Sequence, residues 1–306
     1  MVSKKIRKSK LLIEYIKFLR DYQGSSEATI DIRQRFVEPF LLSLREIGQP
    51  SKLFRLSPQI IHDYIITTAT PLHRASKKHL TSSIRSFLRF AHINSYLKRD
   101  LIEAVPVITT RKLDRLPQSL SWKDVQKLLE MPDRNTPIGR RDYAVLLLLI
   151  RYGVRIGQAT SLKLQDIHWQ EGVLYFPGCK QGNAIHLPLY KDVADALLNY
   201  IRKDRRNTEF QELFLTIKGL ARPLSKHNHY YNNIKKYFVK ANITSASKGS
   251  RLIRHSFASR LVNQQVPIKI IADLLGHRWI ETTFIYTKVN VSQLRQLARE
   301  WPGGEK

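Results

Sequence analysis

The sequence predicts a mainly α protein in two parts. An N-terminal helical bundle is followed by a mixed α+β domain that is mostly helical and contains a small β-sheet or hairpin. Three observations predict this. Apolar residues recur at helical spacing over residues 10–103. A basic segment with little apolar periodicity lies at 106–119. Beyond it, strand-like runs at 172–177 and 184–189 flank a turn that contains two glycines.

The N-terminal part contains helical patterns joined by short polar turns. Pro39 falls inside the second of these patterns and is expected to kink or shorten that helix. The helix predicted over 76–92 has two stripes, about 200° apart around the helix. One stripe is apolar: Leu80, Ile84, Phe87 and Ala91. The other is polar and basic: Lys78, Ser82, Arg85 and Arg89. The second stripe is either an ordinary solvated face or a surface for phosphate contacts, and the charge of the whole chain favours the latter.

The segment that follows predicts a domain boundary. We expect an N-terminal domain over 1–108, a basic linker over 109–118 and a C-terminal domain over 119–306. A helix should begin at Ser121, with Asp124 as an acidic variant of the capping box. The run 143–150 is too evenly apolar for a surface helix and is expected to lie in the core of the second domain.

Charge is the most unusual bulk property. The chain has 306 residues and a formal net charge of +27, and both halves are basic. Its hydrophobic content of 42% is that of a folding chain, so the charge does not belong to a disordered tail. Nucleic acid is therefore the expected partner, with an anionic membrane surface or a ribosome as alternatives.

Cysteine and hydropathy patterns exclude other classes. Cys179 is the only cysteine, so an internal disulfide and a cysteine-based metal site are excluded. No cluster of histidines and carboxylates suggests a metal site, and no cofactor motif is evident. The longest apolar run, 144–150, is far shorter than the roughly 20 residues that span a bilayer. We expect a soluble cytoplasmic protein associated with the nucleoid, with no membrane partner.

An ordered set of polar residues marks the second domain. It runs Arg155, Lys180, the pair Arg251 and Arg254, then His277 and Tyr286. The segments that hold them are Tyr152-Gly153-Val154-Arg155-Ile156, Arg254-His255-Ser256-Phe257-Ala258, Leu275-Gly276-His277, Thr282-Thr283 and Ile285-Tyr286-Thr287. In this order and with these separations the chain resembles the tyrosine recombinase, or phage integrase, family. The N-terminal part, with Ser26-Glu27-Ala28-Thr29-Ile30, resembles that family's helical core-binding domain.

The resemblance implies a role for each residue. Arg155 and Arg254 would bracket a scissile phosphate, because guanidinium forks donate to two oxygens at once and stay charged. Tyr286 would be the nucleophile that forms a 3′-phosphotyrosyl bond. Lys180, at the hairpin tip, would protonate the departing 5′-oxygen, and His277 would donate a hydrogen bond to the phosphate. A solvated turn lysine and a tyrosine packed on neighbouring helix residues are the competing interpretations.

Two positions depart from the family pattern. Arg251 stands where the family usually has histidine, and an arginine cannot accept a proton near pH 7. Gln158 stands where an acidic residue often follows the first arginine. Either the site is more electrostatic and less dependent on acid–base chemistry, or the enzyme is weakened. His255 is expected to pack, because a helix turns it about 100° away from Arg254.

The leading hypothesis is a site-specific DNA recombinase that needs no metal or cofactor. The resemblance implies double-stranded DNA held between two domains, and a homo-tetramer on two DNA sites that exchanges strands through a Holliday junction. It also implies a C-terminal segment, 291–301, that docks on a neighbour, and it leaves the need for accessory proteins open. The alternatives are a type IB topoisomerase, or a DNA-binding protein that has lost catalysis.

Overall fold

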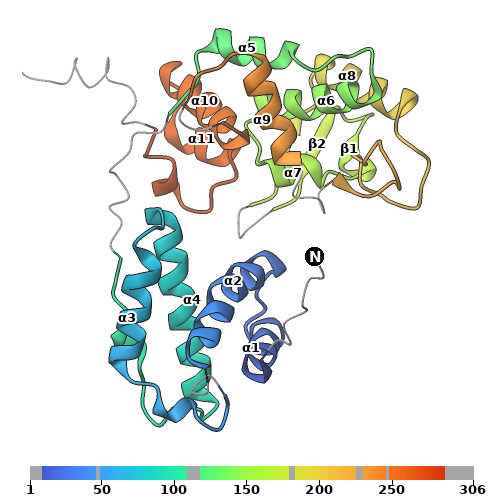
Figure 1. The fold of residues 1–306 in the computed structure, drawn as a ribbon. Helices are drawn as coiled ribbons and strands as arrows, with labels where there is room; N and C mark the ends of the chain where they lie inside the picture. The colour runs from blue at the N-terminus through green and yellow to red at the C-terminus, as the bar shows by residue number, and fades with distance from the viewer. Residues whose placement is uncertain are drawn as a thin grey trace, which may run out of the picture. The chain divides into compact units, whose positions relative to one another are not determined.

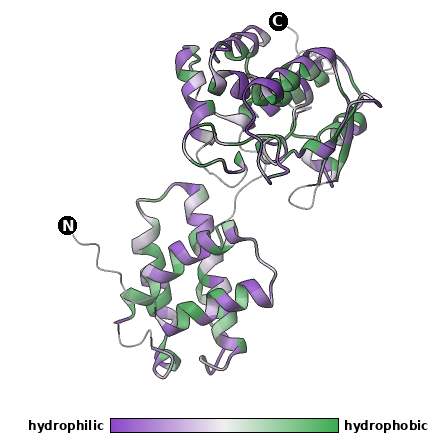
Figure 2. Ribbon diagram, turned by 90° about the vertical axis from the view of Figure 1, so that its right-hand side faces the viewer, coloured by the Kyte–Doolittle hydropathy of each residue, from purple (hydrophilic) through white to green (hydrophobic). Residues whose placement is uncertain are grey.

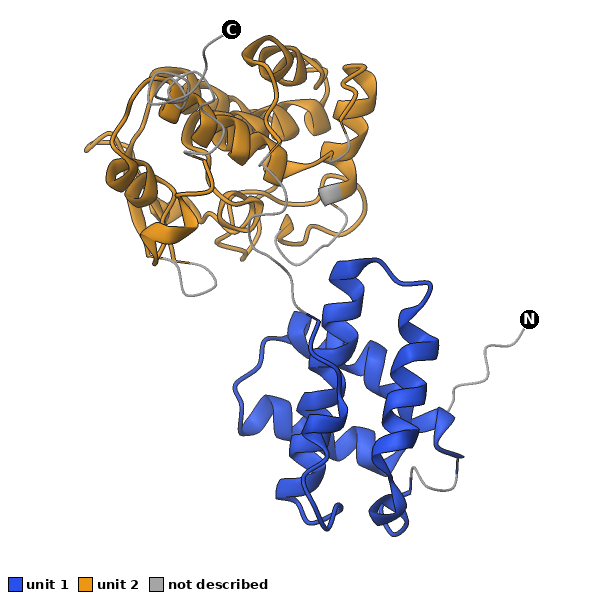
Figure 3. Cartoon of the chain, turned by 90° about the vertical axis from the view of Figure 1, so that its left-hand side faces the viewer, with its two compact units in different colours: residues 1–111 blue, residues 112–306 orange. Residues whose placement is uncertain are grey.

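The structure is a computed structural model that describes residues 9–45, 49–108, 118–178, 183–224, 230–245 and 248–286. Its contacts divide the chain into two compact units, residues 1–111 and 112–306 (Figure 3). The division falls inside the segment expected to be a linker. Most of that segment, 109–117, lies outside the described residues. Each unit has its own hydrophobic core and is described by itself.

The first unit is helical (Figure 1). Tyr15, Phe40 and Phe87 meet at its centre, and the rings of Tyr15 and Phe87 are edge to face with centroids 5.5 Å apart. Its elements are α1 (Lys10–Asp21), α2 (Glu27–Ser43), η2 (Leu53–Arg55), α3 (Pro58–Ala69), α4 (Arg74–Ile93) and η3 (Ile102–Ala104).

The long helix α4 confirms the predicted apolar stripe, because Leu80, Ile84, Phe87 and Ala91 are all fully buried. It packs against α2, whose Phe40 is also buried. Of the two effects expected of Pro39, a kink or a shorter helix, the second does not occur: α2 continues through it to Ser43. We attribute the continuation to the burial of Phe40 and Leu41, which directly follow the proline.

The second unit is built around α6 (Pro137–Tyr152), which is covered by α8 (Lys191–Lys203), α10 (Ser250–Asn263) and α5 (Trp122–Glu130). The predicted burial of 143–150 is confirmed for 144–150, where every residue is buried, whereas Tyr143 is partly exposed. Ser121 is the N-cap of α5: its hydroxyl accepts from the backbone N–H of Asp124 and donates to that residue's carboxylate. The unit's helical elements are α5 (Trp122–Glu130), α6 (Pro137–Tyr152), α7 (Ile156–Thr160), η4 (Leu164–Asp166), α8 (Lys191–Lys203), α9 (Tyr230–Lys240), α10 (Ser250–Asn263), α11 (Ile268–Leu274) and η6 (Ile280–Thr282).

A small antiparallel sheet joins these helices, in the order β1 (Ile167–His168), β2 (Val173–Phe176) and β3 (Ile185–Pro188). Strands β2 and β3 confirm the predicted hairpin, and their register places Leu174 opposite Leu187. Strand β1 was not predicted, because two residues are too few to show an alternating pattern. The fold class is thus confirmed: mainly α, with one small sheet in the second unit.

The helices of both units carry hydrophilic and hydrophobic residues side by side (Figure 2), as expected for amphipathic helices around two cores. Within the described ranges, none of the helices combines the length and hydropathy that a bilayer span requires. In the same ranges, no three side chains of histidine, cysteine, aspartate or glutamate lie together in a way that could hold a metal ion.

Candidate active site

The site begins at a glycine turn that ends α6. Gly153 has φ of +61°, the left-handed conformation that glycine adopts without strain, and it caps the helix. A Cβ at this position would lie 2.3 Å from a ring carbon of Phe257 on α10, so α6 and α10 can approach only because the residue is glycine. The turn points the Gly153 carbonyl at Arg254 and places Arg155 at the start of α7.

A second glycine turn ends α11 and supplies the other carbonyl that holds Arg254. Gly276 has φ of +58°, and a Cβ there would lie 2.8 Å from the Ile185 side chain of β3. The guanidinium of Arg254, only 7% exposed, donates to the Gly153 carbonyl at 2.9 Å and to the Leu275 carbonyl at 2.7 Å. Two helix ends therefore fix the orientation of one buried guanidinium.

The backbone of Arg155 is fixed by a hydrogen bond, whereas one nitrogen of its guanidinium lacks a partner in the described structure. Its backbone N–H donates to the Gln158 side-chain oxygen at 3.2 Å, and the Gln158 amide donates to the Pro177 carbonyl at 3.2 Å. An acidic residue could make the first of these hydrogen bonds but not the second, so glutamine ties α7 to the end of β2. The Nη1 atom of Arg155 is buried and has no hydrogen-bond partner in the described structure. An unpaired, buried guanidinium nitrogen is costly, and an anion would satisfy it.

Tyr286 lies beside α10, and its side chain is 2% exposed. It packs with Ala258, Val262, Ile271 and Leu275 in a small separate cluster. Its hydroxyl is 2.9 Å from Nδ1 of His255. His255 was expected only to pack, and this hydrogen bond with Tyr286 was not predicted. The signal that would have found it is the spacing from Arg251: residues four apart share a helix face, so Arg251, Arg254 and His255 line one side of α10.

His277 follows the second glycine turn and is buried. Its Nδ1 shares a 2.8 Å hydrogen bond with the hydroxyl of Thr283, which is itself fully buried. Burial, then Arg254, Arg155 and His255, lower the pKa of His277 to about 4. The imidazole is neutral near pH 7 and has one N–H to donate. Thr283 belongs to the Thr282-Thr283 motif, but its role in orienting this histidine could not be predicted from spacing alone.

Electrostatic coupling shows which groups share the site. Burial raises the pKa of the Tyr286 phenol, and Arg254, Arg251 and Arg155 pull it back in part. Burial lowers the pKa of His255 to about 4, with further lowering by Arg251 and Arg254. Because such effects weaken with distance, arginines from two separate stretches of the chain, the start of α7 and α10, lie near one phenol. The cluster has surplus positive charge and attracts an anion.

The remaining predicted residues are an exposed arginine at the edge of this cluster, a stripe in the first unit, and one lysine outside the described residues. Lys180 falls in the segment 179–182, outside the described residues. Arg251 is exposed on the first turn of α10. On α4 of the first unit, Lys78, Ser82 and Arg89 are exposed. Arg85 is half-buried, and its guanidinium donates to the Val105 and Pro106 carbonyls at 2.9 Å each.

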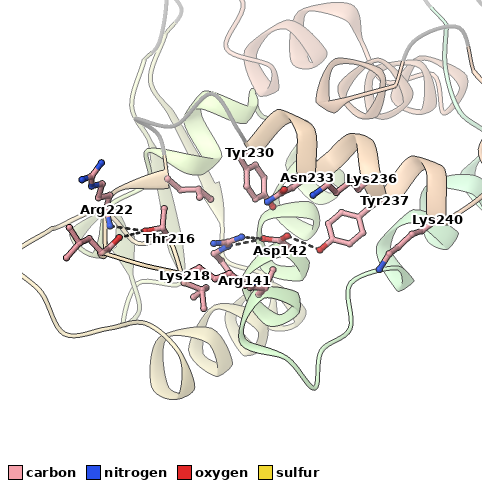
Figure 4. A pocket seen from close by; sticks show the side chains of 14 residues that line it. Arg141, Asp142, Thr216, Lys218, Arg222, Tyr230, Asn233, Lys236, Tyr237 and Lys240 are labelled. Atoms are coloured by element: carbon pink, nitrogen blue, oxygen red, sulfur yellow. Dashed lines mark hydrogen bonds and ion pairs between the residues drawn. The ribbon is translucent and has the colours of Figure 1, made fainter. Parts of the chain in front are cut away.

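A cavity of about 640 Å³ lies between α9 and the 216–224 loop, away from this cluster. Figure 4 shows Arg141, Asp142 and Tyr237 together in it, joined by dashed lines. Arg141 donates to Asp142 at 2.7 Å, and the Tyr237 hydroxyl donates to the same carboxylate at 2.8 Å. These polar groups satisfy one another, so we interpret the network as structural. Further cations line the cavity: Lys218, Arg222, Lys236 and Lys240.

Comparison with known proteins gives an independent view of the chain. Residues 118–293 match the model of the phage integrase family. The chain is 32% identical over 302 residues to "Tyrosine recombinase XerD" of Staphylococcus saprophyticus subsp. saprophyticus, with 95% of this chain and 98% of that protein covered.

Solved structures resemble the fold at lower sequence identity. One is that of the XerH site-specific recombinase bound to difH substrate in a pre-cleavage complex. It has a TM-score of 0.65 and 19% identity, and 95% of this chain and 84% of that one are covered. Another is a lambda integrase dimer bound to a COC′ core site, with a TM-score of 0.63, 20% identity, and 96% and 98% covered. At these identities the two structures support the fold and nothing more.

Proposed function

The chain belongs to the phage integrase family, and on this premise we propose that the cluster around Tyr286 cleaves and rejoins DNA through a 3′-phosphotyrosyl intermediate. Membership makes the protein a tyrosine site-specific recombinase and disfavours the topoisomerase-like and non-catalytic alternatives. One observation carries the proposed chemistry: the buried Tyr286 has its hydroxyl hydrogen-bonded to an imidazole, and the charges of Arg254, Arg251 and Arg155 lower the pKa of its phenol. Such surroundings suit a nucleophile that attacks an anionic phosphodiester.

In the proposed reaction Tyr286 attacks the phosphorus, and the arginines bind the non-bridging oxygens. Arg155 contributes its unpartnered Nη1, and this contact would satisfy a donor that is otherwise buried without a partner in the described structure. Arg254 is held rigidly by two carbonyls, so it needs little reorganisation to stabilise the developing charge. Exposed Arg251 adds a third positive charge at the position where the family usually has a histidine.

Proton donors complete the proposal. We assign the His277 proton to Nε2, with the Thr283 hydroxyl donating to Nδ1, so that the neutral ring donates to the phosphate. Lys180 is proposed as the acid that protonates the departing 5′-oxygen. This role rests on the family resemblance, since the residue lies outside the described structure. The covalent link conserves the energy of the broken diester, so rejoining needs no nucleotide cofactor.

A suicide substrate tests the proposal. DNA from the element that encodes the protein, nicked close to the cleavage point, traps the cleaved state because the released fragment diffuses away. We expect a covalent protein–DNA adduct, with the nucleotide mapped by peptide mass spectrometry to Tyr286. Exchange of strands between two such sites separates recombination from simple relaxation of supercoils. An adduct on another residue, or none with cognate DNA, contradicts the proposed site.

The basic stripe of α4 is proposed to contact DNA phosphates through Lys78, Ser82 and Arg89. Arg85 is not included among these DNA contacts. Its guanidinium already donates hydrogen bonds to two backbone carbonyls of its own unit. Binding through phosphates releases counterions from the DNA. Removing one such cation should therefore reduce the slope of log affinity against log salt by about 0.9.

The double variant Lys78→Gln/Arg89→Gln is expected to lower that slope by about two, measured by fluorescence anisotropy on duplex DNA. Arg20→Gln is the matched control: it removes the same kind of charge from α1, where Arg20 pairs with Glu27 at 3.0 Å. The control should keep the wild-type slope. An unchanged slope in the double variant would argue against phosphate contacts by α4.

We also propose that four copies assemble on two double-stranded DNA sites, in the cytoplasm and at the nucleoid. The segment 291–301 is the proposed docking element, although it lies outside the described residues. An apolar cavity of about 340 Å³, lined in part by Trp122, Phe257, Leu261 and Leu274, offers an acceptor surface of suitable chemistry. Analytical ultracentrifugation with and without DNA carrying two sites would report the assembly. Accessory proteins are not required by any of these observations.

A further inference from the structure

The hydrogen bond between His255 and Tyr286 links the nucleophile to a group that can accept a proton. The Tyr286 oxygen and His255 Nδ1 are 2.9 Å apart, and the ring centroids are 5.5 Å apart. The first distance is within the roughly 2.6–3.2 Å over which a general base can abstract a proton. The contact is made within the second unit, between α10 and Tyr286.

The other groups near the phenol cannot easily take its proton. A phenol with a pKa near 10 is almost fully protonated at pH 7, and burial raises the pKa of Tyr286 further. Arg155, Arg251 and Arg254 remain charged and have no acceptor atom. His277 already shares its Nδ1 with Thr283. Arg251 stands where the family usually has a histidine, so this position offers no group that could accept the proton of Tyr286.

The charges around His255 favour a neutral ring that can act as an acceptor. It faces Arg251 and Arg254 on its own helix, His277 from the turn after α11, and Tyr286. Burial and the two arginines lower the pKa of His255 to about 4, so the ring is neutral near pH 7. With its proton on Nε2, Nδ1 accepts from the phenol. A phosphate bound by the arginines would offset their charge and so raise the pKa of His255, making it a stronger base when substrate is present.

We propose that His255 is the proton acceptor for Tyr286 in cleavage and returns the proton in rejoining. The proposal rests on the function proposed above for Tyr286. In cleavage the Tyr286 oxygen forms a bond to phosphorus, its proton moves to His255 Nδ1, and the bond from phosphorus to the 5′-oxygen breaks. The 5′-oxygen takes a proton from a separate acid and leaves as a hydroxyl. Rejoining reverses each step, so the histidine begins and ends the cycle neutral.

Single-turnover cleavage of the suicide substrate, measured over a pH range of about 5 to 9, tests this role. His255→Ala and His255→Gln are expected to slow cleavage at pH 7 by ~10²- to 10⁴-fold, the range of a general base. Glutamine retains a hydrogen bond but does not titrate, so it should not restore the rate. Both variants should show a rate that keeps rising with pH, because hydroxide then replaces the missing base. His168→Ala, which removes an exposed histidine 3.8 Å from Glu171, is the matched control and should cleave at the wild-type rate.

A more acidic nucleophile separates proton transfer from a structural role. Replacing Tyr286 with a fluorinated tyrosine, whose phenol ionises more easily, should restore much of the cleavage lost in His255→Ala. A structural defect would not be rescued. Variants within about threefold of wild type with an unchanged pH profile would overturn the proposal, as would a loss without rescue. If the wild-type protein itself forms no adduct, the proposed function fails, and that result is distinct from these.

Discussion

Tyr286→Phe is expected to abolish the covalent protein–DNA adduct while leaving DNA affinity within about twofold. The substitution removes one oxygen, and the nucleophile is that oxygen. The ring remains to pack against Ala258 and Leu275, so the local cluster keeps its volume. The loss of the hydrogen bond to His255 should cost about 1 kcal/mol of stability. Adduct formation on the suicide substrate is the measurement, read on a denaturing gel.

Tyr237→Phe is the matched control for this prediction. Tyr237 is also a buried tyrosine whose hydroxyl makes a hydrogen bond of similar length, 2.8 Å, in its case to Asp142. Its removal should destabilise the second unit by ~1–2 kcal/mol, because a buried carboxylate loses a donor. Below the unfolding temperature this variant should still form the adduct at the wild-type rate. An adduct that persists in Tyr286→Phe would show that another residue attacks the phosphate.

The architecture was largely predictable from the sequence, because long elements leave long patterns. The apolar stripe of α4 and the buried run in α6 each repeat over several turns. The two-residue strand β1 leaves no such pattern and was not predicted. The order of arginine, histidine and tyrosine along the chain could be recognised in the same way, since it is a linear property.

Contacts between distant segments could not be predicted from the chain. The position of His255 was inferred from its neighbour Arg254, but its partner Tyr286 lies 31 residues further on. Arg85 belongs to the polar stripe of α4 by spacing, and only folding brings the Val105 carbonyl to it. Gln158 lacks the charge that the family often has there, whereas the structure gives it two hydrogen bonds, of which the one donated to the Pro177 carbonyl requires an amide. In each case the missing information is which backbone carbonyl or side chain lies across the fold.

Arg254→Ala is expected to reduce the rate of cleavage by at least ~10³-fold, equivalent to about 4 kcal/mol of transition-state stabilisation. Two effects add. The transition state loses the guanidinium that two glycine turns hold in place. Arg254 also lowers the pKa of Tyr286, His255 and His277, so its removal should raise all three values. The phenol then ionises less readily, although His255 becomes a slightly stronger base.

The matched variant Arg254→Lys separates charge from geometry. Lysine keeps the positive charge but cannot reach two carbonyls with a planar fork, so we expect an intermediate rate and a smaller rise in the histidine pKa values. Nuclear magnetic resonance titration of the imidazoles would report that rise, and guanidinium ion added to Arg254→Ala should restore part of the cleavage by occupying the vacated space. Stability must be measured in parallel, since the carbonyls of Gly153 and Leu275 lose a buried donor at ~1–3 kcal/mol. Cleavage within about tenfold of wild type by folded, DNA-bound Arg254→Ala would remove this residue from the transition state and leave Arg155 and Arg251 to bind the phosphate.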